Sequence, residues 1–173
     1  SGAFANKATG SNKGITTALT LSGTEAGNYT LTQPTGLTAN VTAAPLTVNG
    51  LAGVDRAYDT TTLASLNGAI TLGGVQGSDN VLPANFATGS FASKTVGSNK
   101  PITTAITLTG TDATNYTLTQ PSLTATVSQA NLNVTGVTAI SRTYNGTTAA
   151  PLGGTAAVTA LGADTVTLGG AGT

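Results

Sequence analysis

Apolar residues and threonines alternate along much of this chain. Segment 102–108, Ile-Thr-Thr-Ala-Ile-Thr-Leu, places both isoleucines and the leucine on one face, with Thr104 between them. The same two-residue period occurs in 15–21, 116–119, 123–128 and 131–135. This alternation predicts strands with one apolar face and one solvated, threonine-rich face, as in antiparallel sheets that are buried on one side.

Glycine-rich turn signals separate these segments. They include Gly73-Gly74, Gly77-Ser78 and Asn145-Gly146, which are dipeptides typical of turns. No stretch keeps a 3.6-residue apolar period with helix caps, and the alanine-rich stretch 149–161 is interrupted by Pro151 and two glycines. The chain is therefore predicted to be all-β, with loop and strand in 149–161.

The chain also repeats itself. Residues 2–34 align with residues 89–121 without a gap, and 24 of the 33 pairs are identical. After one residue is lost, residues 37–62 continue the match on residues 123–148, so the period is about 86 residues. Such a period is too long for the coils of a solenoid and indicates a small domain in tandem.

Two phases of this repeat are possible. The more natural boundaries lie at Thr42–Pro45 and Ser128–Asn131, where a strand ends and a new apolar pair begins. This phase gives the C-terminal part of one unit in 1–44, a complete unit in 45–130 and the N-terminal part of the next unit in 131–173. A boundary near Thr88 would instead give two complete units, 1–87 and 88–173, and the sequence does not distinguish the two phases.

The strand pattern and the period together predict the architecture. We expect tandem small antiparallel β-sandwich-like units of about 86 residues that form a rod. An immunoglobulin-like sandwich and a single curled sheet both fit the pattern. A half unit by itself would expose strand edges and part of its apolar face.

The composition excludes some classes of partner. Six basic and six acidic residues give zero net charge, and charged residues make up only 7% of the chain. So little charge leaves neither the basic clusters that bind nucleic acid nor a polybasic patch for anionic lipid. No apolar run approaches the ~20 residues of a membrane-spanning helix. We therefore expect no nucleic-acid partner and no membrane insertion.

The side chains that carry most enzyme chemistry are missing. The chain contains no His, Cys, Met or Trp. It therefore lacks the usual ligands of zinc, copper and haem, the commonest general base, and thiol chemistry. Serine and threonine are plentiful, but no His can activate them as nucleophiles, and Gly73-Gly74 lacks the lysine of a phosphate-binding loop. We expect no enzyme activity, no catalytic, metal-binding or cofactor-binding residues, and no cofactor.

Two residue sets could still bind a ligand. The four tyrosines fall at repeat-equivalent positions and could form a sugar-binding platform, but we favour core packing for them, as for Phe4 and Phe91. They are Tyr29, Tyr58, Tyr116 and Tyr144. The acidic residues could hold calcium, with Gly77-Ser78-Asp79-Asn80 nearest to a loop site, but we favour a turn there. They are Glu25, Asp55, Asp59, Asp79, Asp112 and Asp164.

Two covalent modifications are conceivable. Lysines recur at equivalent positions, Lys7 with Lys94 and Lys13 with Lys100, and could form isopeptide bonds to asparagine. The Gly-Ser-Asn-Lys segments 10–13 and 97–100 favour exposed turns instead. Glycosylation sequons, which arise easily in a threonine-rich chain, occur at Asn28, Asn40, Asn115, Asn133 and Asn145.

The order of motifs resembles a known family. Tyr58-Asp59-Thr60 and Tyr144-Asn145-Gly146 resemble the Tyr-Asp-Gly triplet of YDG repeats, and Asn-Tyr-Thr-Leu blocks stand at 28–31 and 115–118. A Pro-Leu-Thr-Val restart follows at 45–48. This order is similar to the YDG and related MBG repeats of filamentous-haemagglutinin-like exoproteins of the two-partner-secretion type. Because Asp and Asn exchange between the copies, we interpret the triplet as a turn and not as a ligand site.

The resemblance implies a function outside the cell. We expect stalk or spacer repeats of an extracellular bacterial adhesin or biofilm fibre at the cell surface, with neighbouring repeat units, or other copies in a fibre, as partners. The ligand of the parent protein would then be bound elsewhere. Two alternatives stay open: a filament subunit built by strand complementation, and a displayed module that binds carbohydrate or another partner.

Overall fold

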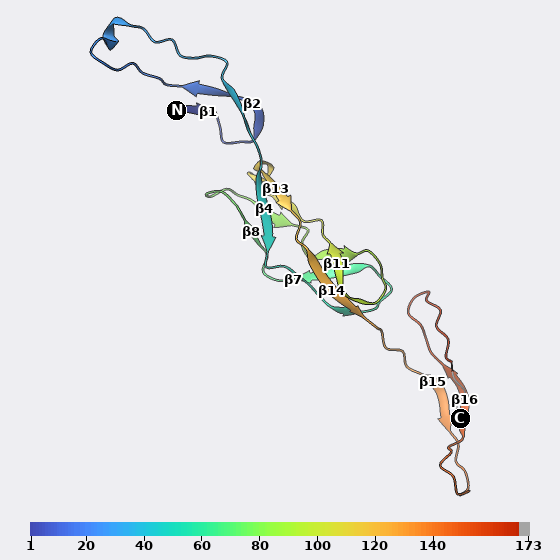
Figure 1. The fold of residues 1–173 in the computed structure, drawn as a ribbon. Helices are drawn as coiled ribbons and strands as arrows, with labels where there is room; N and C mark the ends of the chain where they lie inside the picture. Colours follow the sequence, from blue (N-terminus) through green and yellow to red (C-terminus); the bar gives the residue numbers. More distant parts are fainter. Residues whose placement is uncertain (170–173) are drawn as a thin grey trace. The chain divides into compact units, whose positions relative to one another are not determined.

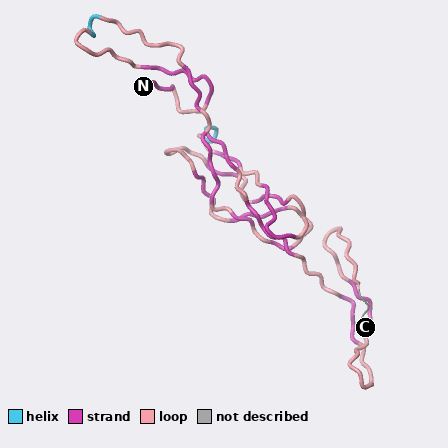
Figure 2. Tube along the Cα trace, in the orientation of Figure 1, coloured by secondary structure: helices cyan, strands magenta, loops and turns pink. Residues whose placement is uncertain are grey.

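The computed structural model describes residues 1–169 and is almost entirely β (Figure 1). Strands account for 42% of the described residues. The helical elements within residues 1–169 are two single 3-10 turns, η1 (Ala26–Asn28) and η2 (Ala113–Asn115). No helix in this range is long and apolar enough to cross a membrane. The all-β prediction is therefore confirmed, and Figure 2 shows many short strands separated by loops.

Contacts divide the chain into two compact units that interleave along the sequence. Unit 1 consists of residues 1–52, 66–88 and 104–122. Unit 2 consists of residues 53–65, 89–103 and those from 123 onward. Each unit therefore combines segments that lie far apart in the sequence, while the predicted repeat boundaries near 44/45 and 130/131 stay a prediction.

Unit 1 contains three small sheets. An antiparallel sheet in the order β1-β2-β3 is formed by β1 (Gly2–Phe4), β2 (Gly10–Thr17) and β3 (Thr38–Val41). A second sheet in the order β13-β4-β8 is formed by β13 (Tyr116–Thr119), β4 (Ala44–Asn49) and β8 (Thr71–Gly73). The third sheet pairs β12 (Thr107–Thr109) with β9 (Leu82–Ala84).

The second sheet supports the core of unit 1. Leu46 on β4 is 0% exposed, and it packs with Val81 and Tyr116, each 7% exposed. Partly buried side chains surround this cluster, among them Leu72 on β8 and Leu118 on β13. Burial of these apolar groups is the main favourable term that holds the three strands together.

Unit 2 is built around a six-stranded curled sheet. Its order is β5 (Ala52–Gly53), β7 (Leu63–Asn67), β10 (Thr88–Phe91), β11 (Gly97–Thr103), β14 (Leu123–Ser128) and β6 (Arg56–Ala57). Phe91, Ile102 and Val127 form its interior and are 2%, 6% and 1% exposed. A separate hairpin pairs β15 (Thr135–Ala139) with β16 (Leu152–Ala157). Of the two predicted architectures, the curled sheet describes this arrangement.

Two strand pairs differ from the antiparallel expectation. β13 pairs parallel with β4, and β14 pairs parallel with β6. Parallel neighbours need a long connection that returns the chain to its starting side, whereas a hairpin turn suffices for antiparallel neighbours. In both pairs the two strands are separated by more than 60 residues of chain, which supplies that connection. Alternation along one strand carries no information about the direction of its neighbour.

Burial agrees with the predicted strand face of 102–108, whereas in 15–21 the strand β2 ends at Thr17 and residues 18–21 are exposed. Along 102–108 the exposure alternates, with Ile102, Thr104 and Ile106 buried and the intervening residues exposed. The strand itself is interrupted after Thr103, because the side chain of Gln120 takes over its hydrogen bonds. Gln120 Oε1 accepts from the backbone N–H of Ile106 at 3.0 Å, and its Nε2 donates to the Ile106 carbonyl at 2.8 Å.

The strand prediction for 131–135 is wrong. Residues 129–134 belong to no strand, and β15 begins only at Thr135. The equivalent segment of the other copy is β4, which has β13 on one side and β8 on the other. Within residues 1–169 no strand occupies the place of β13 beside 130–133, so this backbone lacks the partner that fixes β4 as a strand. By contrast, β16 confirms the strand expected within 149–161.

Candidate functional site

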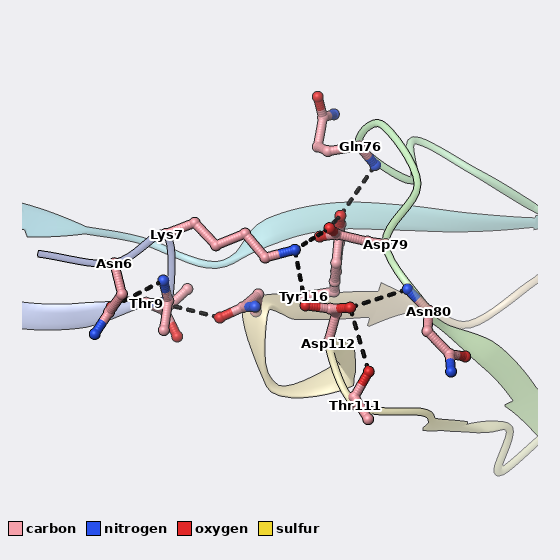
Figure 3. Close-up of polar contacts among 11 residues, drawn as sticks. Asn6, Lys7, Thr9, Gln76, Asp79, Asn80, Thr111, Asp112 and Tyr116 are labelled. Atoms are coloured by element: carbon pink, nitrogen blue, oxygen red, sulfur yellow. Dashed lines mark hydrogen bonds and ion pairs between the residues drawn. The ribbon is translucent and has the colours of Figure 1, made fainter. Parts of the chain in front are cut away.

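The most concentrated polar chemistry of unit 1 is a cluster that we call the Lys7 joint, formed by Lys7, Asp79, Asp112 and Tyr116. Lys7 lies in the loop between β1 and β2, and Asp79 lies in the turn that leads to β9. Asp112 immediately precedes η2, and Tyr116 is the first residue of β13. Four separate segments of the chain therefore meet at one point (Figure 3).

The contacts of the Lys7 joint are mutual. Lys7 Nζ forms ion pairs with Asp79 and with Asp112, the second at 2.9 Å. The Tyr116 hydroxyl donates to Asp79 Oδ2 at 2.8 Å and accepts the Gln76 backbone N–H at 3.0 Å. Asp112 Oδ2 accepts the backbone N–H of Asn80 at 3.0 Å. One ammonium group thus links two carboxylates, and each carboxylate is also hydrogen-bonded by a neighbouring strand or turn.

These contacts shift the pKa values of Lys7, Asp79 and Asp112 so that their charged forms are favoured, whereas Tyr116 is shifted toward its neutral form. Hydrogen bonds from Lys7, and then from Tyr116, lower the pKa of Asp79. Lys7, followed by the Asn80 amide, lowers the pKa of Asp112 in the same way. The two carboxylates raise the pKa of Lys7 above its ordinary value, while desolvation is the largest cause that raises the pKa of Tyr116. The cluster is therefore a charged, closed network at neutral pH.

Unit 2 contains a related cluster, the Lys94 joint, formed by Lys94, Asp164 and Tyr58. Lys94 Nζ lies 2.7 Å from Asp164 Oδ1, and the Tyr58 hydroxyl donates to Asp164 Oδ2. The same ammonium lies 5.6 Å from the centre of the Tyr58 ring. Hydrogen bonds from Lys94, and then from Tyr58, lower the pKa of Asp164, and Asp164 is the main cause of a raised pKa at Lys94.

The two joints are versions of one arrangement. Lys7 and Lys94 are repeat-equivalent, and the ion pairs join residues 72 and 70 positions apart. Asp79 and Asp164 close the same turn, since each donates its backbone N–H to the residue three positions earlier at 3.1 Å. Gly77 and Gly162 occupy the same left-handed position in that turn, with φ of 53° and 55°.

The tyrosine partner differs between the joints. Asp79 binds Tyr116, whose repeat equivalent is Tyr29, whereas Asp164 binds Tyr58, whose equivalent is Tyr144. Tyr116 is buried and Tyr58 is half-buried, but Tyr29 and Tyr144 are 72% and 91% exposed. Core packing is thus confirmed for Tyr116 and is wrong for Tyr29 and Tyr144.

The two equivalent phenylalanines show the same contrast between copies. Phe91 is 2% exposed, as predicted for a core residue, whereas Phe4 is 38% exposed, so the prediction fails there. Phe91 lies on β10, which has β7 on its outer side in the six-stranded sheet. Phe4 lies on β1, an edge strand of a three-stranded sheet, where no such neighbour covers it within the described residues.

The Tyr-Asp-Gly-like triplets form turns in both copies. Asp59 Oδ1 accepts from the backbone N–H and the hydroxyl of Thr61 at 2.9 and 2.8 Å. Asn145 Oδ1 accepts from the same two groups of Thr147 at 3.2 and 2.9 Å. These contacts confirm the turn interpretation, because an amide oxygen and a carboxylate oxygen accept the bonds equally.

The backbone conformation at the third position of the triplet explains why one copy has a glycine there. Thr60 and Gly146 both adopt a left-handed backbone, with φ of 72° and 74°. A β-branched residue is strained in this region, whereas glycine is not. The copy that carries Thr60 therefore folds into the same turn with backbone strain that Gly146 avoids.

The structure gives the remaining candidate residues ordinary structural contacts. Asp79 lies in the expected turn, where its carboxylate binds an ammonium and a hydroxyl, and residues 1–169 hold no cluster of three acidic side chains that could bind a metal. The Lys7 side chain is 67% exposed and has a raised pKa, so its amine stays protonated and is a poor nucleophile for an isopeptide bond.

The other lysine pair and four of the sequon asparagines also form hydrogen bonds. Lys13 Nζ donates to Asn6 and Lys100 Nζ to Ser93, each over a distance of seven residues in the sequence. Among the sequon residues, hydrogen bonds are made by the side chains of Asn28, Asn40, Asn115 and Asn145. Glycosylation stays a prediction.

Sequence reasoning did not find either joint. It placed Lys7 and Asp79 in separate hypotheses, one about cross-links and one about calcium. A signal was present, because lysine and aspartate recur together in both copies at nearly the same separation. That coincidence alone does not show a contact, since every well-matched residue of a repeat recurs in the same way.

The curled sheet, the parallel additions and the recurring joints define a tandem all-β repeat protein whose segments are held together by internal polar contacts. A search against family models identifies the repeat. The YDG domain matches residues 1–36, 42–125 and 128–173. The chain therefore belongs to the YDG domain family. Neither the curated proteins nor the solved structures contain a match to this chain.

Proposed function

We propose that this chain consists of structural stalk or spacer repeats of an extracellular bacterial adhesin or biofilm matrix fibre. Its partners are neighbouring repeat units, and it carries no catalytic site of its own. It projects a binding region, located elsewhere in the parent protein, from the cell surface.

The observation that carries this proposal is the internal use of the polar groups. In both joints the lysine, the aspartate and the tyrosine hydroxyl bind one another. These contacts join strands and loops from distant parts of the sequence, as a scaffold under tension requires. The lysine–aspartate pair recurs one repeat later, which suits a chain that gains length by adding equivalent units.

Two further properties support the proposal. The chain contains no cysteine, so this part of a parent chain exported unfolded cannot form a premature disulfide. The wet strand faces carry threonine, which keeps the surface hydrated although charge is scarce. Membership of the YDG domain family over three consecutive segments agrees with a repeat array.

Single-molecule force spectroscopy tests the mechanical part of the proposal. Proteins with one, two and four copies of the repeat are stretched between a surface and a cantilever. Each unfolding event should add about 300 Å of contour length, which is ~86 residues at ~3.5 Å each. The number of events should rise with the number of copies. Extension without discrete events would contradict a mechanical role.

The location and the binding alternative need separate measurements. Antibodies against this chain should label intact cells of the source bacterium, whereas labelling only after lysis would contradict a surface location. A glycan array probed with purified protein should show no binding, because Tyr116 and Tyr58 are used inside their units. Specific glycan binding lost in Tyr144→Ser would instead support the displayed binding module, since Tyr144 is 91% exposed.

A further inference from the structure

Two strand pairs of this protein run parallel, and each joins an early strand to a late one. β4 pairs with β13, which lies beside it in Figure 1, and β6 pairs with β14. More than 60 residues separate the two strands of each pair. The other pairs with a defined register in residues 1–169 are antiparallel and join strands that are closer in the sequence. The parallel pairs therefore close the longest segments of chain.

The direction of a strand pair decides how it responds when the chain is pulled at its two ends. The pull reaches β4 at its N-terminal end, where Ala44 lies opposite Tyr116. It reaches β13 at its C-terminal end, where Thr119 lies opposite Thr47. The two loaded ends are therefore at opposite ends of the pair. The force acts along the strands, so the hydrogen bonds between β4 and β13 must break together.

An antiparallel pair of an early and a late strand would respond differently. Its two loaded ends would lie side by side, so the pull would separate the strands one residue pair at a time. Each hydrogen bond that has to break in the same step lengthens the lifetime of a contact about fivefold. Four residues of β4 pair with four residues of β13, so shearing this contact is much slower than unzipping it.

The first side chain of β13 also opposes sliding. The Tyr116 ring packs against Leu46 and Val81, and all three side chains are buried. The Tyr116 hydroxyl donates to Asp79 Oδ2 at 2.8 Å and accepts the Gln76 backbone N–H at 3.0 Å. When β13 slides along β4, both hydrogen bonds must break while the ring leaves this cluster. Tyr116 therefore anchors β13 in the same step in which the backbone hydrogen bonds break.

The Lys7 joint holds the partners of this anchor in place. Lys7 forms ion pairs with Asp79, which binds the Tyr116 hydroxyl, and with Asp112, which precedes η2 and β13. The Lys7 side chain is 67% exposed, and ion pairs at such positions contribute little. The buried Tyr116 side chain is therefore the stronger of the two restraints.

Unit 2 contains a shorter contact of the same kind. Residues 56–57 of β6 pair in parallel with residues 127–128 of β14. The backbone N–H of Tyr58 donates to the Ser128 carbonyl at 2.8 Å and extends this contact by one residue. A pull on the chain again reaches the early strand at its N-terminal end and the late strand at its C-terminal end. Each unit therefore has one contact that is sheared by tension.

We propose that the β4–β13 pair is the contact with which unit 1 resists tension along the chain, and that Tyr116 is its main side-chain anchor. While this pair holds, the residues between the two strands are shielded from the load. The inference rests on the spacer role proposed above, because a chain that projects a binding region bears tension when that region is held. It does not depend on the identity of the bound ligand.

Magnetic tweezers, which hold the full chain at a constant force, test whether the contact depends on the direction of pulling. The chain has no cysteine, so two introduced cysteines define the points at which force is applied. Thr42→Cys with Ser122→Cys places them before β4 and after β13, which shears the pair. Asn49→Cys with Ser122→Cys places both at the C-terminal ends of the two strands, which unzips the pair. All three positions are exposed, so the core stays intact.

The lifetime of the contact at a given force is the measured quantity. It should be about tenfold longer or more in the shearing geometry than in the unzipping geometry, which corresponds to between one and two further hydrogen bonds broken in the same step. Equal lifetimes in the two geometries, or a longer lifetime in the unzipping geometry, would overturn the inference.

Two variants in the shearing geometry test the anchor. Tyr116→Phe removes the hydroxyl that bonds Asp79 and should shorten the lifetime about tenfold, the effect of one hydrogen bond to a charged group. Ile102→Val is the matched control, because this side chain is 6% exposed but lies in unit 2, outside the loaded strands. It should leave the lifetime unchanged. An equal loss in both variants would show that the lifetime follows overall stability and would overturn the inference.

These outcomes are distinct from the tests of the proposed function. The comparison of the two geometries needs neither variant, so it decides the inference even if Tyr116→Phe does not fold. Equal lifetimes would refute the β4–β13 contact as the source of resistance, while each copy of the repeat could still unfold in a discrete event. A contact that depends on direction, in a chain that antibodies label only after lysis, would support this inference and contradict the proposed location.

Discussion

Two equivalent leucines in different surroundings provide a direct test of the core. Leu46 on β4 is 0% exposed, whereas its repeat equivalent Leu132 is half-buried and lines an open groove of about 520 Å³ in unit 2. Leu46→Ala removes three buried carbon atoms, worth ~0.8 kcal/mol each, or about 2.4 kcal/mol of transfer free energy. The cavity left beside Val81 and Tyr116 adds about another 1 kcal/mol. We therefore expect the free energy of unfolding to fall by about 3–4 kcal/mol.

Leu132→Ala is the matched control. Its side chain loses roughly half as much buried surface, and the open groove needs no new cavity, so the expected cost is about 1 kcal/mol. The residue type is the same and the two positions are repeat-equivalent, so burial is the main difference between the two leucine side chains.

Urea unfolding measures this difference. The chain has no tryptophan, and tyrosine fluorescence reports mainly on Tyr116 and Tyr58, since Tyr29 and Tyr144 are exposed in the folded protein. Hydrogen exchange of the β4 amides gives a second, local readout. Equal losses of stability for Leu46→Ala and Leu132→Ala would refute the conclusion that β13 covers Leu46 and that no strand among residues 1–169 covers Leu132 in the same way.

Three further predictions follow from the joints and the turns. Tyr116→Phe removes the hydroxyl between Asp79 and the Gln76 amide and should cost about 1–3 kcal/mol in urea unfolding. Thr60→Gly relieves the left-handed strain and should raise the melting temperature, with a gain of up to about 1 kcal/mol. The lowered pKa values of Asp79 and Asp112 mean that their contribution to stability is complete above about pH 4 and is lost as the pH falls further, which an acid titration by circular dichroism follows.

Each of these predictions has a matched control. Tyr29→Phe should be neutral because Tyr29 is 72% exposed, so an equal loss there would show that the Tyr116 effect is not due to its buried hydrogen bonds. Gly146→Thr should destabilise the second turn, and a neutral result would contradict the strain assigned to Thr60. Lys7→Met should raise the midpoint of the acid transition, because the pKa values of its two carboxylates return toward their ordinary range. An unchanged midpoint would contradict the role of the ion pairs.

Local patterns along the chain predicted much of the secondary structure correctly. The two-residue period placed Ile102, Thr104 and Ile106 on the buried face, and the exchange of Asp59 for Asn145 indicated a turn. These features depend on neighbours within a few residues, so each short segment contains the information needed. Identity between residues 2–34 and 89–121 established the repeat in the same direct way.

Pairing at long range could not be predicted from these patterns. The parallel pairing of β13 with β4, and the meeting of Lys7 with Asp79 across 72 residues, depend on which strand edges the folded chain brings together. Alternation is the same whichever neighbour a strand has, and it does not show the direction of that neighbour.

The equivalent tyrosines show most clearly what each level decides. The sequence by itself determined that Tyr29 and Tyr116 occupy the same place in a repeated all-β unit, because their flanking residues are nearly identical. Only the tertiary structure decided that Tyr116 is buried and Tyr29 is exposed. A side chain is buried only when other residues cover it. Leu46 on β4 and Val81 cover Tyr116, whereas no residues among 1–169 cover Tyr29 in the same way.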